Sequence, residues 1–313
     1  MTIVKVLAVV LGMLALALGA LAWATWAPDR PVSELKARWA QPPSTFVQLQ
    51  GMEVHLRDEG PRGDPLPIVL LHGTSSSLHT WDGWTKALAG TRRVIRFDLP
   101  GIGLTGPAPD GDYRIERYAG FVAAMLDKLG VARCVLAGNS FGGQVAWETA
   151  LAYPARVDKL VLVDAAGYPL QPVSVPIGFR IARIPLLNRL MEFTLTRSLI
   201  ESSVRNVYGD PAKVTPALVD RYYELTLRAG NRRALVQRFA QFPAGLHPER
   251  IRALKVPTLI LWGGRDRLLP PGDGERFHRD IAGSRLVVFD KLGHVPQEED
   301  PAASVAAVKQ FLF

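Results

Sequence analysis

One short stretch decides how this chain is interpreted: Val135-Leu136-Ala137-Gly138-Asn139-Ser140-Phe141-Gly142-Gly143. Its first three residues are apolar and typical of a strand, and the residues that follow the glycine pair continue as a helical pattern. The stretch therefore predicts a strand that turns sharply into a helix, with Ser140 at the turn. Glycines at 138 and 142 suit this geometry because they carry no side chain that would clash. The start of the helix then favours negative charge near the serine oxygen.

Outward from this turn, short β-type runs alternate with helical patterns. The expected strands are 46–50, 53–57, 67–71, 93–97, 133–137, 160–163, 258–262 and 286–289, and the expected helices are 115–129, 141–153, 274–281 and 302–312. This alternation predicts an α/β fold with a mostly parallel sheet and helices on both faces. The first two runs meet at Gly51-Met52, which predicts an antiparallel hairpin at one edge.

The alternation breaks once, between the sixth and seventh expected strands. Residues 165–256 carry apolar and basic helical patterns without a clear strand. An insertion of about 90 residues must fold by itself or cover something. We therefore expect a helical cap at 165–256, inserted after strand six into a core formed by 45–164 and 257–313.

Charge is distributed unevenly along the chain. The net charge is +8, and residues 165–256 alone hold 14 Lys and Arg against 6 Asp and Glu. Such an excess indicates either an anionic partner surface or simply a solvated helical face. Arg180, Arg183, Arg189 and Arg197 alternate with apolar residues, a pattern typical of helices at a lipid surface. No nucleic-acid recognition motif is evident, so a membrane is the expected partner.

The N-terminus contains a run of 22 uncharged residues from Val6 to Ala27. A helix of this length reaches roughly 33 Å, enough to cross a bilayer core. Residues 1–27 are therefore interpreted as a membrane anchor. The alternative is a signal peptide cleaved at Ala22-Trp23-Ala24, which would leave a secreted or periplasmic protein. Residues 28–44 follow as a proline-marked linker, and its apolar Val32, Leu35 and Trp39 suggest either an interfacial helix or a plain spacer.

A serine hydroxyl needs a base to become a nucleophile, and the base needs an acid. His294 is the candidate base, because it lies in a loop after the last expected strand. Asp266 follows the strand 258–262 and is the candidate acid, while Asp164 competes because it also follows a strand. The chain order Ser140, Asp266, His294 is the one expected when the serine lies at a strand–helix turn. The structural alternatives are a surface histidine and an Asp266 paired with a neighbouring arginine.

Further motifs in the chain form a recognisable set: His72-Gly73, Asp98-Leu99-Pro100-Gly101-Ile102-Gly103, Gly138-Asn139-Ser140-Phe141-Gly142-Gly143, Trp262-Gly263-Gly264-Arg265-Asp266 and Gly293-His294. This combination resembles the α/β-hydrolase superfamily, in the branch with a cap between strands six and seven, over about residues 46–313. The resemblance implies Ser140 as nucleophile, Asp266 as acid and His294 as base. It also implies an oxyanion hole made of the backbone N–H groups of Phe141 and of Thr74 or a neighbour, no cofactor and no metal. His72 is then structural.

Several activities are compatible with such a site. The anchor and the hydrophobic cap resemble those of monoacylglycerol lipases and related esterases, which favours a serine hydrolase that cleaves acyl esters of a small molecule or lipid. The Gly-Asn-Ser-x-Gly-Gly form also resembles carbon–carbon bond hydrolases of ring-cleavage products. Perhydrolase or acyl-transfer activity and a non-catalytic, membrane-tethered binding module are further alternatives. Dehalogenases and epoxide hydrolases of this fold carry an aspartate at the turn, and Ser140 argues against both.

Overall fold

A computed structural model describes residues 2–169, 171–184, 187–241 and 247–312. Positions 170, 185–186 and 242–246 of the expected cap, and position 313 of the expected core, lie outside this set. The strands are β1 Thr45–Leu49, β2 Met52–Glu59, β3 Ile68–Leu71, β4 Val94–Phe97, β5 Cys134–Asn139, β6 Val157–Val163, β7 Thr258–Gly263 and β8 Arg285–Phe289. The helices of the core are α3 Asp82–Leu88, α4 Ile115–Lys128, α5 Phe141–Ala152, α11 Pro271–Asp280, α12 Pro296–Glu299 and α13 Pro301–Leu312. Those of the N-terminus and the insertion are α1 Thr2–Thr25, α2 Val32–Trp39, α6 Ile177–Ala182, α7 Leu187–Leu190, α8 Arg197–Val207, α9 Pro216–Thr226 and α10 Asn231–Gln241.

The eight strands form one sheet in the order β1-β2-β4-β3-β5-β6-β7-β8. The pairs β1–β2 and β2–β4 are antiparallel, and all the others are parallel. Strand β3 is a continuous apolar run because both faces of the sheet are covered. Alternate residues separate into two cores: Val69 and Leu71 pack toward α4 and α5, while Ile68 and Leu70 pack toward α3 and α13. This is the mostly parallel, doubly covered sheet that the sequence predicts.

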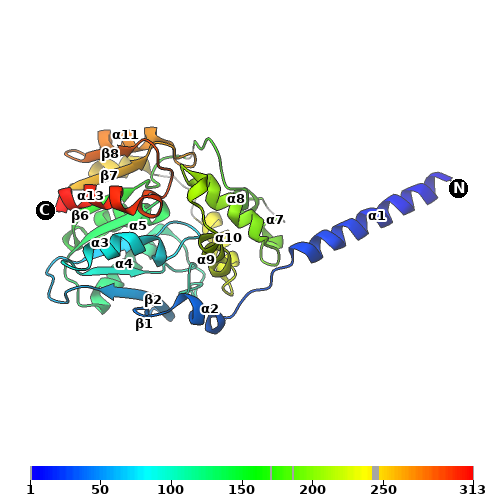
Figure 1. Ribbon diagram of the computed structural model, residues 1–313, viewed down its shortest axis with the longest axis horizontal. Helices are drawn as coiled ribbons and strands as arrows, with labels where there is room; N and C mark the ends of the chain where they lie inside the picture. The colour runs from blue at the N-terminus through cyan, green and yellow to red at the C-terminus, as the bar shows by residue number, and fades with distance from the viewer. Residues whose placement is uncertain (1, 170, 185–186, 242–246, 313) are drawn as a thin grey trace.

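Helices α6 to α10 lie together between the sheet and α1, at one end of the molecule (Figure 1). They connect β6 to β7, so they sit beyond the ends of these parallel strands. The apolar and basic helical patterns expected within 165–256 form these five helices, and α9 and α10 are separated at Gly230, whose φ is +86°. We call the helices α6–α10 and their connections the cap.

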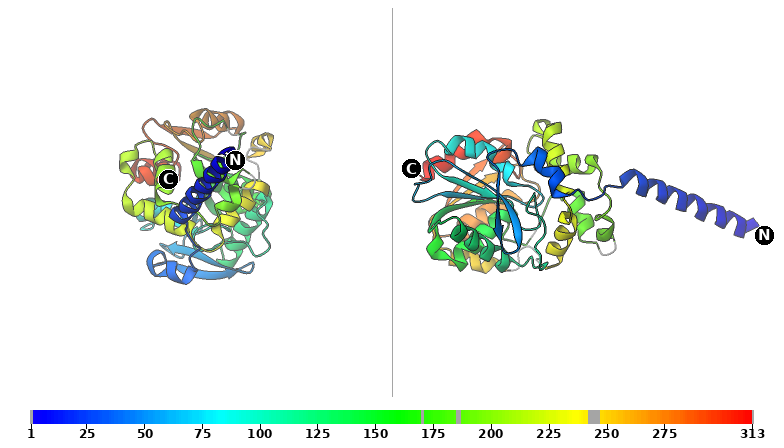
Figure 2. Two further views of the ribbon diagram at one scale, coloured as in Figure 1. Left: turned by 90° about the vertical axis from the view of Figure 1, so that its right-hand side faces the viewer. Right: turned by 90° about the horizontal axis from the view of Figure 1, so that it is seen from below.

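Helix α1 projects away from the rest of the chain, on the cap side of the molecule (Figures 1 and 2). Its residues Lys5–Thr25 are long and apolar enough to cross a membrane, with a mean hydropathy of 2.5 and none of this span buried. The end of α1 is attached to the cap. The Trp26 and Phe193 rings stack with centroids 5.9 Å apart, and the backbone N–H groups of Ala27 and Leu195 donate to the carbonyls of Phe193 and Thr25 at 2.9 and 3.0 Å.

Helix α2 is neither a plain spacer nor an interfacial helix. Leu35 is 2 % exposed and packs against Leu104 and Leu225, so the apolar face of α2 is covered by the protein itself. Arg38 pairs with Asp220 and Glu224 of α9. The segment after α1 is therefore fastened to the cap, and its apolar face is not available to lipid.

Candidate active site

Ser140 lies at the turn between β5 and α5, in the conformation that the sequence predicts for a strained residue. Its φ is +56° and its ψ −118°, a region where a non-glycine residue is held only by its surroundings. A Cβ on Gly138 would lie 2.1 Å from the Gly142 carbonyl oxygen, and one on Gly142 would lie 2.3 Å from the carbonyl oxygen of Leu71. The glycines of the motif are therefore needed because backbone passes backbone there.

Asp266 and His294 form a buried hydrogen-bonded pair. Asp266 follows β7 and His294 follows β8, and these strands are neighbours in the sheet, so their ends bring the two loops together. His294 Nδ1 lies 2.6 Å from Asp266 Oδ2. The other carboxylate oxygen of Asp266 accepts the backbone N–H groups of Leu268 and Leu269 at 2.8 and 3.0 Å. Because these three donors fix the carboxylate, Nδ1 of His294 carries the proton and Nε2 is left as the basic nitrogen.

Asp164 lies beside this pair but has different partners. It follows β6 with a φ of +42°, and its Oδ1 accepts the backbone N–H of Gly263 at 2.9 Å. Burial and then the neighbouring Asp266 carboxylate raise the pKa of Asp164 well above its usual range. A protonated Asp164 can donate a hydrogen bond from its carboxyl group to Asp266. Oδ2 of Asp164 then has a partner that it would lack in the ionised form. The ligand atoms of Asp164, Asp266 and His294 lie within 4.8 Å of one another, but hydrogen bonds already occupy Asp266 and His294 Nδ1, which is the pattern of an acid–base pair.

Asn139, the residue before Ser140, connects the serine turn to the histidine loop. Its Nδ2 donates to the carbonyl oxygens of His294 at 2.9 Å and of Val163 at 3.1 Å. The backbone N–H of His294 in turn donates to the Val207 carbonyl of α8 at 2.7 Å. The sequence motif contains Asn139, but its position alone gave no role. The structure makes it the link that sets the spacing between the β5 turn and the β8 loop.

His72 and Asp98 build the loops beside the site. His72 Nδ1 donates to the Gly73 carbonyl at 2.8 Å, and Nε2 accepts the Leu99 backbone N–H at 3.0 Å. Burial lowers the pKa of His72, so the ring is neutral and bridges the loops after β3 and β4. Asp98 is buried too, yet its contact with the His55 ring, 2.8 Å from Oδ2, keeps its pKa well below the usual range. Both side chains therefore act on structure.

The expected oxyanion-hole residues flank the serine. Thr74, Ser140 and Phe141 line one cavity of about 630 Å³, counting its open mouth. A Cβ on Gly73 would lie 3.2 Å from the Ser140 Cβ, so the loop carrying Thr74 approaches the nucleophile closely. The other walls come from α5, the loop after β6, the cap and the loop after β7: Gln144, Ala166, Val175, Phe179, Arg183, Arg238, Phe239, Leu268 and Leu269.

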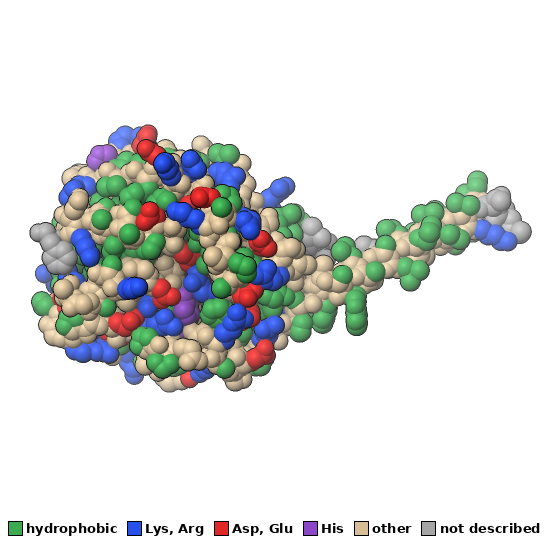
Figure 3. Space-filling view, in the orientation of Figure 1, with side chains coloured by type: hydrophobic (Ala, Val, Ile, Leu, Met, Phe, Trp, Pro, Cys, Tyr) green, Lys and Arg blue, Asp and Glu red, His purple; other side chains and the backbone are tan. Residues whose placement is uncertain are grey.

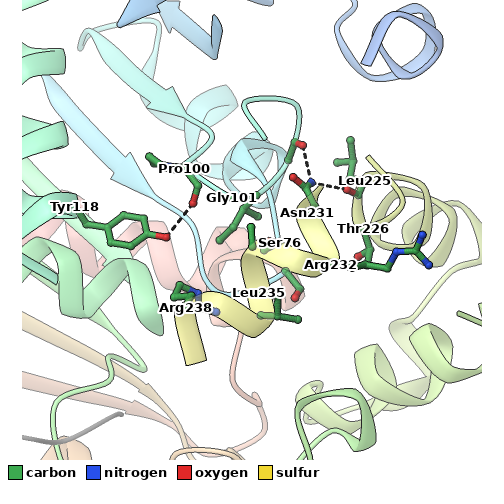
Figure 4. A pocket seen from close by; sticks show the side chains of 14 residues that line it. Ser76, Pro100, Gly101, Tyr118, Leu225, Thr226, Asn231, Arg232, Leu235 and Arg238 are labelled. Atoms are coloured by element: carbon green, nitrogen blue, oxygen red, sulfur yellow. Dashed lines mark hydrogen bonds between the residues drawn. The ribbon is translucent and has the colours of Figure 1, made fainter. Parts of the chain in front are cut away.

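A second cavity, of about 640 Å³, lies within the cap and shares Thr74 and Phe179 with the first. Its wall is almost entirely apolar and includes Met191, Leu195, Leu199, Ile200, Val204, Val207 and Leu235. A third, smaller pocket lies between the loop after β4 and the helices α9 and α10 (Figure 4). Arg238 of α10 lines both this small pocket and the cavity at Ser140. Nothing in the sequence distinguishes Arg238 from the other cap arginines.

The sequence of this chain is similar to those of known hydrolases. A family described as "alpha/beta hydrolase fold" matches residues 67–301, and the chain belongs to it. A 2-hydroxy-6-oxo-2,4-heptadienoate hydrolase from Pseudomonas putida is 30% identical over 284 residues, which cover 85% of this chain and 95% of that protein. The fold and relatives of this kind identify the protein as a hydrolase.

Two solved structures show the same architecture. A meta-cleavage product hydrolase from Pseudomonas fluorescens has a TM-score of 0.74 at 25% identity, and the match covers 86% of this chain and 97% of that one. A membrane phospholipase A, described as a bacterial virulence factor, has a TM-score of 0.73 at 26% identity. This second match covers 99% of this chain and 96% of the other, so it includes the region of α1.

Proposed function

We propose that this protein is a membrane-anchored serine hydrolase that cleaves acyl esters through an acyl-enzyme on Ser140. The single observation that carries the proposal is that the cavity at Ser140 and the apolar cavity of the cap are neighbours that share Thr74 and Phe179 in their walls, beside the attachment of α1. An ester bound with its carbonyl carbon at Ser140 has room for an apolar acyl chain in the cap.

The proposed chemistry uses only side chains and backbone groups of this chain. Ser140 Oγ attacks the ester carbonyl carbon while His294 Nε2 takes the hydroxyl proton, and Asp266 stabilises the resulting imidazolium. The backbone N–H groups of Phe141 and Thr74 are the proposed donors to the carbonyl oxygen as it becomes negative. The carbon–oxygen bond to the alcohol breaks, and the alcohol leaves with the proton from His294. Water then attacks the acyl-enzyme by the same steps, releasing the carboxylic acid and restoring Ser140.

The surroundings of α1 support a lipid-like substrate. Leu195, which lines the apolar cavity, donates its backbone N–H to the carbonyl of Thr25 at the end of α1. Around this attachment the cap exposes apolar side chains, with Phe193 52% and Ile177 47% exposed, and Trp23 of α1 is 86% exposed. Apolar side chains also cover the visible face of α1 (Figure 3). A bilayer crossed by α1 would meet this face of the cap, so an acyl chain could pass from lipid to the cavity over a short distance.

Carbon–carbon bond hydrolysis is the second candidate, and the identity to the Pseudomonas putida hydrolase favours it. One experiment separates the two activities. Full-length protein in a neutral detergent is assayed with p-nitrophenyl esters of two to sixteen carbons and with 2-hydroxy-6-oxo-2,4-heptadienoate. The proposal expects ester turnover that rises with chain length beyond four carbons. Turnover of the dienoate with negligible turnover of every ester would contradict it.

A further inference from the structure

Part of the positive charge of residues 165–256 is paired within the protein. Arg197 pairs with Asp220, Arg221 with Glu298, Arg232 with Asp29 and Arg250 with Glu148. Glu298, Asp29 and Glu148 lie outside residues 165–256, so acids elsewhere in the chain compensate part of the positive excess of this segment.

Arg238, at the site, is buried without such a partner. It is only 4% exposed, yet within the described part of the chain it forms no ion pair. Its Nη2 donates to Thr74 Oγ1 at 2.9 Å, and its guanidinium lies over the Phe141 ring with Cζ 4.2 Å from the centroid. Thr74 and Phe141 are the two expected oxyanion-hole residues, so this cation lies next to the reacting position.

The other N–H groups of Arg238 are available to a ligand. Nε and Nη1 have no acceptor among the described residues, but unlike the corresponding atoms of Arg232 they are not sealed in the interior. Arg238 lines the cavity at Ser140, so a bound molecule can reach these donors. A buried guanidinium without a carboxylate is costly, and an anionic ligand would offset that cost.

A second guanidinium lies nearby. Arg183 of the α6 end lines the same cavity, and both Arg183 and Arg238 have Cζ 5.1 Å from the centroid of the Phe239 ring. Burial and then the charge of Arg183 lower the pKa of Arg238. Two like charges converge on one ring in a cavity whose lining residues include no Asp or Glu. This arrangement favours a ligand with negative charge.

We propose that Arg238, assisted by Arg183, forms an anion subsite that selects esters whose alcohol part carries a phosphate or a carboxylate. This inference rests on the proposed ester hydrolase function. An ester carbonyl at Ser140 has two arms. The apolar cavity of the cap accepts the acyl arm, and the alcohol arm then lies on the arginine side of the cavity.

The test compares three esters with the same eight-carbon acyl chain: a neutral acylglycerol, its 3-phosphate, and the corresponding ester of glyceric acid. The full-length protein in neutral detergent is expected to show a kcat/KM at least about tenfold higher for a charged ester, as a charge-assisted hydrogen bond permits. The faster of the two charged esters identifies the anion as phosphate or carboxylate. Equal rates on all three esters, or a preference for the neutral one, would overturn the proposal.

Variants separate an anion subsite from a role in holding Thr74. Arg238→Gln is expected to lower kcat/KM for the charged esters much more than for the neutral ester, and so to remove the charged-ester preference, and Arg238→Lys should retain part of the preference. Arg183→Gln should weaken it less, because Arg183 is exposed. The matched control is Arg233→Gln, an exposed arginine of the same helix that lines neither cavity. An equal loss on neutral and charged esters in Arg238→Gln would mean that Arg238 only positions Thr74, and the proposal would be wrong.

Binding distinguishes failure of this inference from failure of the proposed function. Calorimetry on the full-length Ser140→Ala variant measures affinity for the three esters without turnover. Tighter binding of a charged ester, lost on adding Arg238→Gln, supports the subsite even if no ester is hydrolysed. Equal affinity for the charged and neutral esters contradicts the subsite even if all three are hydrolysed by the unaltered enzyme.

Discussion

The polar residues at the carboxyl ends of strands β5 to β8, a region called the edge below, are arranged differently from those of the cap. At the sheet edge, Asp266, His294 and Asn139 are held by short hydrogen bonds to one another's loops, and each has a fixed orientation. In the cap, the wall of the apolar cavity is mostly apolar, and the charged side chains at the cavity of Ser140 are Arg183 and Arg238, neither of which has an ion pair among the described residues. In the proposed enzyme, this difference assigns the chemical step to the edge and the selection of the substrate to the cap. Variants at the edge should then lower turnover of every substrate, whereas variants in the cap should change the ranking of substrates.

The largest effect is expected at the edge, from Ser140→Ala. Removal of the nucleophile should lower kcat by several orders of magnitude, because the rest of the site cannot supply a covalent intermediate. The melting temperature should not fall, because alanine can adopt the same backbone conformation and the substitution removes only the hydroxyl group. Steady-state assays with a p-nitrophenyl ester, together with a thermal melt, measure both. A variant that keeps more than about a tenth of the activity would show that another residue is the nucleophile.

The next largest effect on kcat is expected from substitution of one of two aspartates at the same edge. Asp266→Asn should lose most of its kcat, because an amide favours the wrong histidine tautomer, an effect of about ten-thousandfold in a serine protease. Asp164→Asn should lose far less. Burial and the neighbouring Asp266 raise the pKa of Asp164 well above its usual range and so favour its protonated form, and asparagine keeps both an acceptor for Gly263 and a donor toward Asp266. If Asp164→Asn lost more kcat than Asp266→Asn, the acid would have to be reassigned to the loop after β6.

The sequence predicts the edge better than the cap for a physical reason. The turn at Ser140 requires glycines and a serine at fixed spacing, so a short run of consecutive residues is enough to predict it. Strand alternation likewise predicts the mostly parallel sheet, which the structure confirms. Cap helices pack by apolar faces that many sequences satisfy, and the same pattern suits lipid, core or solvent.

Three examples show this limit. Leu35 is on an apolar face that suggests a lipid interface, but the partner is Leu225, which no local pattern identifies. Arg238 is one arginine among many in the cap, and only its distance to Thr74 singles it out. Asp164 and Asp266 both follow strands, and only the 2.6 Å contact with His294 separates them.

A cap variant tests the other side of the comparison. Ser203 lines the apolar cavity from α8, and its hydroxyl donates to the Leu199 carbonyl of the same helix. Ser203→Leu should shorten the preferred acyl chain, lowering kcat/KM for a long ester by about tenfold while a two-carbon ester is unaffected. Ser203→Ala is the matched control and should keep the chain-length profile. An unchanged profile in Ser203→Leu would mean that the acyl chain does not enter this cavity.

The smallest effect on turnover is expected from removal of α1. Because Trp26 and Ala27 pack on the cap, the deletion should cover residues 2–22 and leave these two residues in place. This variant should leave the membrane fraction yet hydrolyse a two-carbon ester at the rate of the full-length protein. Retention in the membrane fraction would contradict the anchor as the main attachment. A mature N-terminus at Thr25 in the native protein would show a cleaved signal instead.

The most direct test of the central claim is to trap the acyl-enzyme. Full-length protein is mixed with excess p-nitrophenyl octanoate, quenched in acid within the first turnover, digested and mapped by mass spectrometry. Our account predicts a burst of p-nitrophenol that matches the enzyme concentration, and an octanoyl group on the peptide that contains Ser140. Hydrolysis of the ester with no acyl group on Ser140, or with the group on another residue, would contradict it.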